Sequence, residues 1–449
     1  MSSRRSLEIQ RRLDAALQAF EAGDCERATT QLRGALEVDP KDPNAHQLLS
    51  VVLFQLGREV EAITHLEESL AIAPANGDAW LNLGNMVASR DRSKAEQAFR
   101  TALEFAPNLV PARGCLASMY VDDGRYAEAA IELRALLAFA PDDGSALRLL
   151  AKSLRETRDF AGAVDVALHA FRTTPDERLR AAISRTYFLW FDSVDTNPAA
   201  ARPVLEAWLG FDPADPVAKH MHAALTGADA PARASDAFVQ QHFDEFAPTF
   251  DEVLGRLEYR APEQVAEQIA RIFPKPSASL AIVDLGCGTG RCGPLVRAWA
   301  AHLVGVDLSE KMLERAERLG VYDVLVQREL TGYLDDKEAA FDLAFAADTF
   351  IYFGPLEEVF AATFRALVPG GVFVAGFELL GGGDEDAFRL HTGGRFAHRE
   401  DYVRSRLREA GFEVLDVVAK TLRLNYLEPV CGIIASARKP GGVVPSSQR

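Results

Sequence analysis

Small, apolar and helix-ending residues recur with a common period through the first half of the chain. Prolines recur at intervals of 34, 33, 34 and 34 residues, at Pro40, Pro74, Pro107, Pro141 and Pro175. Alanines recur in step with them, at Ala28, Ala62, Ala95, Ala129 and Ala163. Apolar residues follow these alanines by four positions, at Leu32, Leu66, Phe99 and Leu133. Each unit places a small residue where two helices cross and a proline that ends the second helix, so the pattern predicts an array of helix pairs.

This pattern resembles the tetratricopeptide repeat (TPR), a helix pair that stacks into a superhelix. The resemblance is clearest in the third unit, where Trp80, Leu83 and Gly84 occupy the family's first-helix positions. A degenerate sixth unit is expected over 177–213 and a capping helix over 216–225. The resemblance implies an all-α N-terminal domain.

The resemblance also implies a partner surface, because such arrays bind peptides on the concave face formed by the first helices. Arg148, Lys152 and Arg155 fall at i, i+4 and i+7 in the fifth unit and so share one helix face. We expect them to form a clamp for an acidic segment or a C-terminal carboxylate of a protein partner. A solvated charged stripe is the alternative.

The second half alternates apolar strands with helices, as a doubly wound α/β sheet requires. The run VDLGCGTG, from Val283 to Gly290, predicts a buried strand over 281–285 that ends in a glycine loop. A helix over 291–300 and a strand over 303–306 should then bring Asp307 to the carboxyl edge of the sheet, where open α/β folds bind ligands. Apolar stretches over 412–422 and 429–437 predict a reversed final hairpin.

The glycines alone leave two classes of cofactor open. Gly288, Gly290 and Gly293 also satisfy the GxGxxG spacing of a dinucleotide site. Asp284 lies inside the first strand, two residues before the first glycine, where its charge would repel a pyrophosphate. This acid disfavours a nicotinamide or flavin site, and a glycine turn without any ligand is the remaining alternative.

Together the run and Asp307 resemble class I S-adenosylmethionine-dependent methyltransferases. The whole chain looks like the bacterial family of predicted methyltransferases with N-terminal TPRs. The resemblance implies a Rossmann-like domain, a seven-stranded, mostly parallel sheet with an antiparallel last strand, and S-adenosyl-L-methionine as cofactor. The cofactor contacts that it implies are Asp284, Gly286, Cys287, Gly288, Gly290, Asp307, Leu308, Met312, Glu329, Leu330, Ala347, Asp348, Tyr259 and Arg260.

Two of these contacts need comment: Arg260 lies in a segment expected to cover the pocket, and Glu329 departs from the family's pattern. A lead-in helix over 243–263 should cover the pocket, with Arg260 paired to the methionine carboxylate of the cofactor. An amphipathic helix docked on the sheet edge is the alternative for each covering residue. Glu329 stands where the family often has an aspartate that contacts the adenine amino group, and its longer side chain displaces that acceptor.

Candidate catalytic residues follow from the chemistry of methyl transfer, in which the protein aligns the acceptor, excludes water and removes a proton. His391 and His398 lie in the insert after the fifth strand, and Tyr352 follows the fourth. Capping or packing is the alternative for His398, and a core position is the alternative for Tyr352. The two histidines lack a third ligand, so no metal site is expected.

The net charge restricts the classes of partner that we expect, and the cysteine content indicates the redox state of the compartment. The chain has 65 acidic and 49 basic residues, a formal net charge of −16, which argues against nucleic acid or an anionic membrane as main partner. Five cysteines are odd in number and scattered, as in a reducing compartment. No apolar segment has the length of a signal peptide or a membrane span. We expect a cytoplasmic protein.

We therefore expect a TPR domain over 1–225, a linker over 226–236, a methyltransferase domain over 237–439 and a disordered tail over 440–449. Three functions remain open. The first is methylation of a protein or peptide recruited by the repeats. The second is O- or carboxyl-methylation of a small molecule, with repeats that serve oligomerisation. The third is a non-catalytic interaction protein that binds the cofactor.

Overall fold

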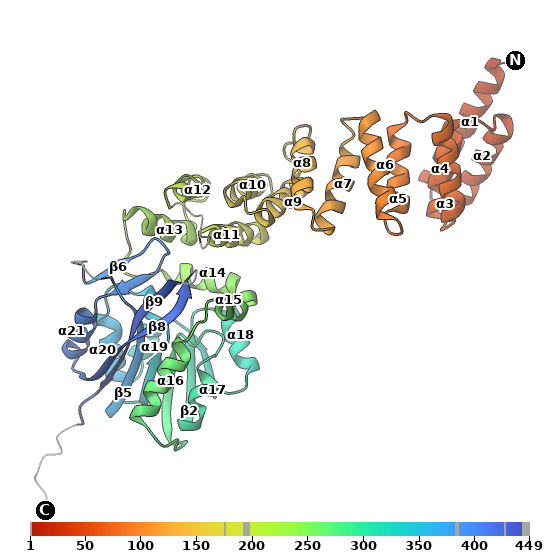
Figure 1. Cartoon of the computed structure of the whole chain (residues 1–449). Helices are drawn as coiled ribbons and strands as arrows, with labels where there is room; N and C mark the ends of the chain where they lie inside the picture. Colours follow the sequence, from red (N-terminus) through yellow and green to blue (C-terminus); the bar gives the residue numbers. More distant parts are fainter. Residues whose placement is uncertain (1, 175–176, 192–197, 382–385, 426–427, 442–449) are drawn as a thin grey trace, which may run out of the picture. The chain divides into compact units, whose positions relative to one another are not determined.

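The chain divides into two compact units, Met1–Ile183 and Ser184–Arg449. The computed structural model describes residues 2–174, 177–191, 198–381, 386–425 and 428–441 (Figure 1). The division precedes the linker that the sequence predicts over 226–236. Part of that predicted linker is bound to the rest of the second unit by backbone hydrogen bonds. The Ala234 amide donates to the Tyr352 carbonyl at 2.9 Å, and the Gly354 amide donates to the Ala232 carbonyl at 2.9 Å.

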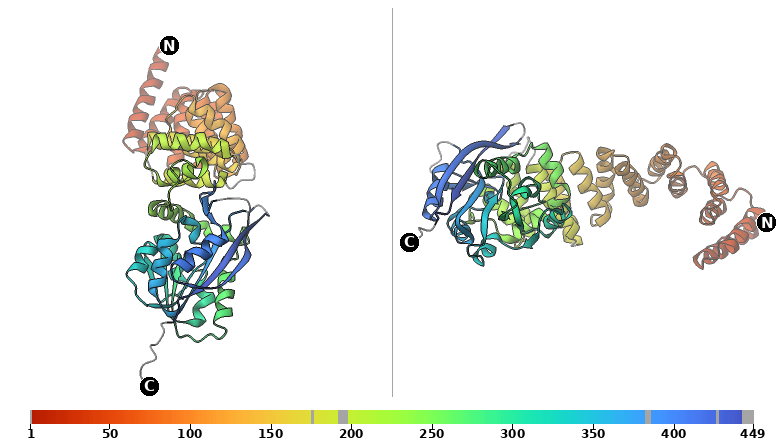
Figure 2. Two further views of the ribbon diagram at one scale, coloured as in Figure 1. Left: turned by 90° about the vertical axis from the view of Figure 1, so that its left-hand side faces the viewer. Right: turned by 90° about the horizontal axis from the view of Figure 1, so that it is seen from below.

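The first unit is built from antiparallel helix pairs that follow one another along the chain (Figure 2). Its helices are α1 (Ser2–Glu21), α2 (Cys25–Val38), α3 (Pro43–Gln55), α4 (Glu59–Ile72), α5 (Gly77–Val87), α6 (Arg92–Phe105), α7 (Val110–Asp122), α8 (Tyr126–Leu137), α9 (Gly144–Glu156), α10 (Phe160–Thr173) and the beginning of α11 (Glu177–Phe191). The repeat alanines are fully buried or within 1% of it, at Ala28, Ala62, Ala95, Ala129 and Ala163. The predicted helix array is confirmed, while Pro175 lies outside the described residues.

A close approach of two helices explains the glycine at one of the family's positions. A Cβ atom at Gly84 in α5 would lie 2.4 Å from Cε1 of Phe99 in α6. Any larger residue at position 84 would therefore force the Phe99 side chain to shift.

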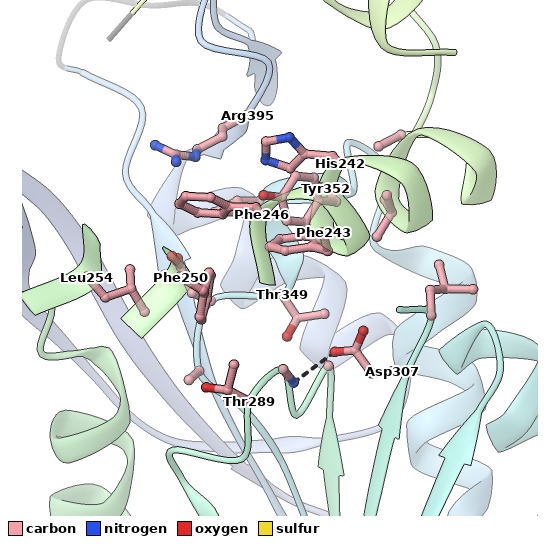
Figure 3. A pocket seen from close by; sticks show the side chains of 18 of the residues that line it. His242, Phe243, Phe246, Phe250, Leu254, Thr289, Asp307, Thr349, Tyr352 and Arg395 are labelled. Carbon is pink, nitrogen blue, oxygen red and sulfur yellow. Dashed lines mark hydrogen bonds between the residues drawn. The ribbon is translucent and has the colours of Figure 1, made fainter. Parts of the chain in front are cut away.

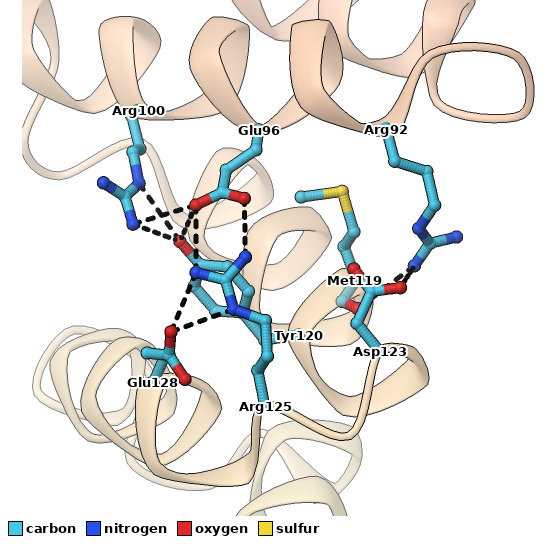
Figure 4. Close-up of polar contacts among 8 residues, drawn as sticks. All are labelled: Arg92, Glu96, Arg100, Met119, Tyr120, Asp123, Arg125 and Glu128. Carbon is cyan, nitrogen blue, oxygen red and sulfur yellow. Dashed lines mark hydrogen bonds and ion pairs between the residues drawn. The ribbon is translucent and has the colours of Figure 1, made fainter.

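Charged side chains join the third and fourth helix pairs at the surface of the array (Figure 4). Glu96 in α6 accepts a hydrogen bond of 2.6 Å from Arg125 and one of 2.9 Å from the Tyr120 hydroxyl. Arg125 precedes α8 and also donates to Glu128 at 2.9 Å. Burial in part raises the pKa of Tyr120, so this hydroxyl stays a donor to the carboxylate.

The three basic residues of the predicted clamp lie on α9. Arg148 and Lys152 are exposed, and the Arg155 side chain is 22% exposed and pairs with Glu156 at 3.0 Å. The Lys152 ammonium lies 5.9 Å from the ring centroid of Tyr126. Their common helix supports the predicted face, and the partner stays a prediction.

The second unit begins with helices and continues with alternating strands and helices that form a sheet covered by helices. Its helices are the end of α11, α12 (Pro198–Phe211), α13 (Pro216–Thr226), α14 (Asp236–Phe246), η1 (Ala247–Thr249), α15 (Phe250–Arg256), α16 (Ala261–Ile272), α17 (Gly293–Val296), η2 (Arg297–Trp299), α18 (Glu310–Arg318), α19 (Leu330–Asp335), η3 (Phe350–Tyr352), α20 (Glu357–Ala366) and α21 (Glu400–Glu409). Its strands are β1 (Leu280–Leu285), β2 (Ala300–Asp307), β3 (Val324–Gln327), β4 (Phe341–Ala346), β5 (Leu367–Glu378), β6 (Phe388–Leu390), β7 (Phe396–His398), β8 (Glu413–Asn425) and β9 (Glu428–Arg438).

Seven of the strands form one sheet in the order β3-β2-β1-β4-β5-β9-β8. The first five strands of this order are parallel, β9 is antiparallel to β5, and β8 is antiparallel to β9. The predicted Rossmann-like sheet with a reversed final hairpin is confirmed. Strands β6 and β7 form a separate hairpin within the insert.

Successive residues of each central strand enter two different cores, as the two-residue period of a strand requires. Val283 of β1 packs in the cluster with α19, α20 and α21, whereas Ile282 packs in the cluster with α16 and α17. Helices on both faces thus cover the central strands β1, β4 and β5, whereas β3 at the sheet edge is partly exposed, and the carboxyl ends of β1, β2 and β4 form one edge.

Two predicted helices differ from the structure. The helix predicted over 291–300 is reduced to α17 and η2, because β2 begins at Ala300 and the segment starts with Gly293 and Pro294. The lead-in helix predicted over 243–263 begins earlier and is broken into α14, η1, α15 and α16. Pro248 lacks the N–H that would continue α14, which explains the break.

Two further predictions concern membranes and the tail. None of the helices in the described part of the chain has the length and apolar character needed to cross a membrane. The tail predicted over 440–449 falls, from residue 442 onward, outside the described residues.

Candidate cofactor site

The loop after β1 carries three glycines with left-handed backbone conformations. Gly286, Gly288 and Gly290 have φ of 75°, 54° and 85°. A Cβ at Gly286 would lie 2.4 Å from Oγ1 of Thr349, and a Cβ at Gly290 would lie 3.0 Å from Leu319. A Cβ at Gly288 would meet nothing within 4 Å. Two glycines therefore permit close packing of the loop, and Gly288 leaves room for a ligand to approach the backbone.

Asp307 ends β2 next to this loop, and backbone amides orient its carboxylate. Oδ2 accepts a hydrogen bond of 2.8 Å from the Gly288 amide, and Oδ1 accepts one of 2.9 Å from the Ser309 amide. Burial raises the pKa of Asp307, while these amides lower it. Each oxygen retains a lone pair, so the carboxylate can still accept hydrogen bonds from a ribose diol.

Asp284 lies in β1 beneath the loop and is only 1% exposed. Its Oδ2 accepts a hydrogen bond of 2.7 Å from the Tyr322 hydroxyl. Burial raises the pKa of Asp284 to about 7, although the Tyr322 hydrogen bond lowers it. The residue does not line the cavity described next, and its contact with the methionine half of the cofactor stays a prediction.

A cavity of about 390 Å³ opens above the loop, at the carboxyl edge of β1, β2 and β4 (Figure 3). The glycine loop and Asp307 form its floor. Its upper wall is aromatic, with Phe243, Phe246, Phe250, Tyr352 and His242. The cavity therefore joins a polar floor to an apolar chamber, as ligand sites at such edges commonly do.

Two aspartates tie the covering helices to the floor. Asp244 of α14 accepts a hydrogen bond of 2.6 Å from the Ser309 hydroxyl. Asp251 of α15 accepts hydrogen bonds of 3.0 Å from the Thr289 hydroxyl and 2.6 Å from Arg315. The cover is thereby held directly over the glycine loop and the start of α18.

Most of the predicted cofactor contacts line this cavity. They are Gly286, Cys287, Gly288, Asp307, Leu308, Glu329, Leu330, Ala347, Asp348 and Tyr259. Four predicted contacts do not line it: Asp284, Gly290, Met312 and Arg260. Met312 lies in α18 and is fully buried. Arg260 is exposed, and its amide donates to the Leu422 carbonyl at 2.9 Å. Its side chain does not line the cavity, and its pairing with a methionine carboxylate stays a prediction.

Glu329 lines the cavity while capping α19. Its two carboxylate oxygens accept hydrogen bonds from the amides of Thr331 at 3.0 Å and Gly332 at 2.7 Å. Both oxygens are held by the helix start, an arrangement that fixes the side chain and leaves one lone pair on each oxygen.

A buried ion-pair cluster forms the wall beyond β4. Arg423 of β8 donates to Asp348 at 3.3 Å and to Glu378 at 2.5 Å, and its side chain is 5% exposed. Burial raises the pKa of Asp348 to about 6, although the Arg423 charge lowers it. Asp348 Oδ1 has no hydrogen-bond partner among the described residues. This oxygen is the acceptor that the wall offers to a ligand.

The predicted catalytic histidines do not line the cavity. His398 is fully buried, its Nε2 lies 3.0 Å from the Gly354 carbonyl, and its ring stacks on Tyr402 at 6.1 Å. Burial lowers the pKa of His398 to about 4. His391 closes the turn between β6 and β7, where its amide donates to the Arg395 carbonyl at 2.8 Å. The catalytic role of the two histidines stays a prediction, and of the three candidates only Tyr352 lines the cavity.

The sequence analysis assigned no role to several ionisable residues that line the cavity, among them His242, Glu245 and Arg395. Burial, with the charge of Arg395 and with His220, lowers the pKa of His242 to about 3. Burial raises the pKa of Glu245 to about 7. Arg395 hydrogen-bonds Tyr352 and lowers the pKa of that hydroxyl, which burial raises. The spacing of Phe243, Phe246 and Phe250 along the covering segment was the available signal.

Two protein families match this chain. The methyltransferase domain matches residues 282–371, and the tetratricopeptide repeat matches residues 13–77 and 116–177. Methyltransferase-like protein 27 of Homo sapiens is 38% identical over 84 residues, 18% of this chain and 34% of that protein. Trans-aconitate 2-methyltransferase of Paracidovorax citrulli is 35% identical over 120 residues, 26% of this chain and 45% of that protein.

A solved structure covers more of the chain at lower identity. It is 1,6-didemethyltoxoflavin-N1-methyltransferase of Burkholderia thailandensis with bound 1,6-didemethyltoxoflavin and S-adenosylhomocysteine, 21% identical with a TM-score of 0.37, over 47% of this chain and 93% of that one. The chain spans 34% and 45% of the length of the two curated relatives.

Proposed function

We propose a reaction from one premise: this chain carries a methyltransferase domain at residues 282–371 and tetratricopeptide repeats before it, as its sequence predicts. The proposed activity is transfer of a methyl group from S-adenosylmethionine to an acceptor in the cavity. The observation that carries this proposal is the pairing of Gly288 with Asp307 at the cavity floor. The free space beside the Gly288 backbone lies next to the fixed Asp307 carboxylate. The carboxylate suits the ribose of the cofactor, and the free space suits the chain attached to it.

When bound, S-adenosylmethionine supplies an electrophilic methyl group. The chain's own residues orient the acceptor, exclude water and take up a proton. The aromatic wall supplies the exclusion of water. Asp348 is the proposed proton acceptor, because its Oδ1 has no partner among the described residues and because burial raises its pKa to about 6. A carboxyl with this pKa is ionised at neutral pH and remains a usable base.

The proposed acceptor is a small and largely apolar molecule. Phe243, Phe246 and Phe250 line the chamber with ring faces and edges, and Arg395 adds positive charge. This combination suits a flat or unsaturated acceptor that carries an anionic group. A protein acceptor recruited by the repeats is the second candidate, favoured by the exposed Arg148 and Lys152 on α9. A cytoplasmic location belongs to the same proposal.

Transfer of labelled methyl from S-adenosylmethionine into an extract of the source cells tests the reaction and sorts the candidates. We expect label in the small-molecule fraction with the native protein and none with Asp307→Ala. Label in protein instead supports the second candidate. Cofactor binding without label in either fraction supports the non-catalytic alternative and contradicts the proposed activity.

A further inference from the structure

Two histidines and a glutamate meet within the second helix pair of the first unit. His46 lies on α3, and His65 and Glu68 lie on α4. The Nδ1 atom of His46 lies 3.0 Å from Nδ1 of His65 and 3.0 Å from Oε2 of Glu68. The Nδ1 atom of His65 lies 3.4 Å from the same Oε2. We propose that these three atoms bind a divalent transition-metal ion of the Zn²⁺ class. This proposal is independent of methyl transfer.

The distances among the three atoms match those around one metal ion. Imidazole nitrogens and carboxylate oxygens bind Zn²⁺ at about 2.0 to 2.2 Å. Ligands at that distance, with angles between about 90° and 110°, lie roughly 3.0 to 3.5 Å apart. All three edges of this triangle fall in that range, so one ion above its face reaches every ligand.

The backbone selects the tautomer of His46 that a metal needs. Its Nε2 lies 3.0 Å from the Pro40 carbonyl oxygen, which can only accept a hydrogen bond, so Nε2 carries the proton. In a neutral ring Nδ1 then presents a lone pair, and it faces the Glu68 carboxylate oxygen at 3.0 Å. Two acceptors at that distance repel unless a cation lies between them. A second ring nitrogen held by a carbonyl is also the usual support of a metal-binding histidine.

The exposed fraction of the three side chains increases from His46 to His65 to Glu68, which leaves a path for an ion from solvent. The His46 side chain is 7% exposed, that of His65 is 25% exposed and that of Glu68 is 52% exposed. The ion would reach the buried imidazole from solvent and keep water in its remaining positions. Because the ligands come from both helices of the pair, the ion would join α3 to α4.

Simple sequence spacing did not reveal this site, since His46 and His65 are 19 residues apart. The antiparallel packing of α3 and α4 brings them together. The alternative occupant is a proton, which would make His46 an imidazolium that donates to both neighbours.

Metal titration of the full-length protein without a purification tag distinguishes the two occupants. The metal-free protein is titrated with Co²⁺, monitored by d–d absorption, and then with Zn²⁺ in competition. We expect one bound equivalent in the native protein and at least tenfold weaker binding in His65→Ala and in Glu68→Gln. Both side chains are partly exposed, so circular dichroism should show that both variants fold.

His169→Ala on α10 is the matched control, because His169 pairs with Asp142 at 3.0 Å and belongs to no three-ligand group among the described residues. This variant should retain the equivalent. Native protein that binds no Co²⁺ or Zn²⁺ at this stoichiometry overturns the proposal, and so does full binding by folded His65→Ala.

Discussion

The Gly288 amide donates a hydrogen bond of 2.8 Å to Oδ2 of Asp307, and this bond joins the glycine loop after β1 to the end of β2. The Ser309 amide holds the second oxygen at 2.9 Å. The carboxylate thus has one orientation before any ligand arrives. Preorganisation of this kind reduces the free energy lost on binding.

Replacement of Asp307 by alanine should remove cofactor binding while the fold remains. The carboxylate is the fixed acceptor of the floor, and charge-assisted hydrogen bonds contribute about 1.5 to 3 kcal/mol each. We expect S-adenosylmethionine affinity, measured by calorimetry, to fall by at least tenfold in Asp307→Ala and by less in Asp307→Asn. Unchanged affinity in folded Asp307→Ala would falsify the assignment of the floor.

A Cβ at Gly288 should affect the ligand more than the fold. Its φ of 54° makes alanine strained by about 1 kcal/mol, and the new methyl group would enter the open space of the floor. Gly320 is the matched control, because its φ is 64° and its Cβ also meets nothing within 4 Å, but it does not line the cavity. Gly288→Ala and Gly320→Ala should lose similar unfolding free energy, and only Gly288→Ala should weaken cofactor binding. Equal binding by both variants contradicts a ligand at this floor.

Asp284 should make the fold less stable as the pH rises. Burial raises its folded pKa to about 7 from an ordinary value of 3.8. Its contribution to stability is therefore complete below about pH 4 and is lost as the pH rises through about 7. Asp284→Asn keeps a neutral acceptor for Tyr322, so between pH 5 and pH 8 it should lose about 1 to 3 kcal/mol less stability than the native protein. Urea unfolding at the two pH values measures this, and equal losses in both proteins would show an ordinary carboxyl.

Arg423 should be essential for stability. Its removal leaves Asp348 and Glu378 as buried carboxylates without their cation. We expect Arg423→Met to lose about 3 to 5 kcal/mol of unfolding free energy. Arg202 pairs with Glu206 across an exposed helix surface, so Arg202→Met should lose less than about 1 kcal/mol. Similar losses in the two variants would mean that the cluster is solvated.

We expect His398 to contribute to stability and not to methyl transfer. Comparing the activity of its variants at several pH values tests this. In glutamine, the amide nitrogen reaches a position similar to Nε2 and can donate to the Gly354 carbonyl. We expect His398→Gln to retain methyl transfer with an unchanged pH profile, and His398→Ala to lose about 2 to 4 kcal/mol of stability through the cavity and the lost hydrogen bond. A folded His398→Gln protein without activity would restore this residue as a catalytic candidate.

The helix pairs and the strands were predictable because each depends on a spacing of residues that are close in sequence. Buried alanines in every helix pair and the reversed hairpin of β8 and β9 follow from residues a few positions apart. The Asp307 position follows from the length of one strand. These parts of the fold and of the cavity floor agree with the sequence predictions.

The direction of individual side chains relative to the cavity was not predictable from the sequence. Arg260 and Tyr259 are neighbours, yet only Tyr259 lines the cavity, while Arg260 is the exposed N-cap residue of α16. His398 resembles a base in sequence, and only the packing around β7 shows it fully buried. His242 and Arg395 are 153 residues apart and meet through tertiary contacts that no local pattern encodes.

The cavity wall begins at Ser184 in α11, well before the predicted methyltransferase domain, and it includes Arg185, Phe188 and Leu189. A helix that continues the repeat series is therefore also part of the chamber. Recombination that exchanged the repeats of this protein for another array would leave the chamber whole only if it joined the halves before residue 184. The structural unit that contains the chamber is therefore larger than its sheet, and its boundary lies inside the helical series.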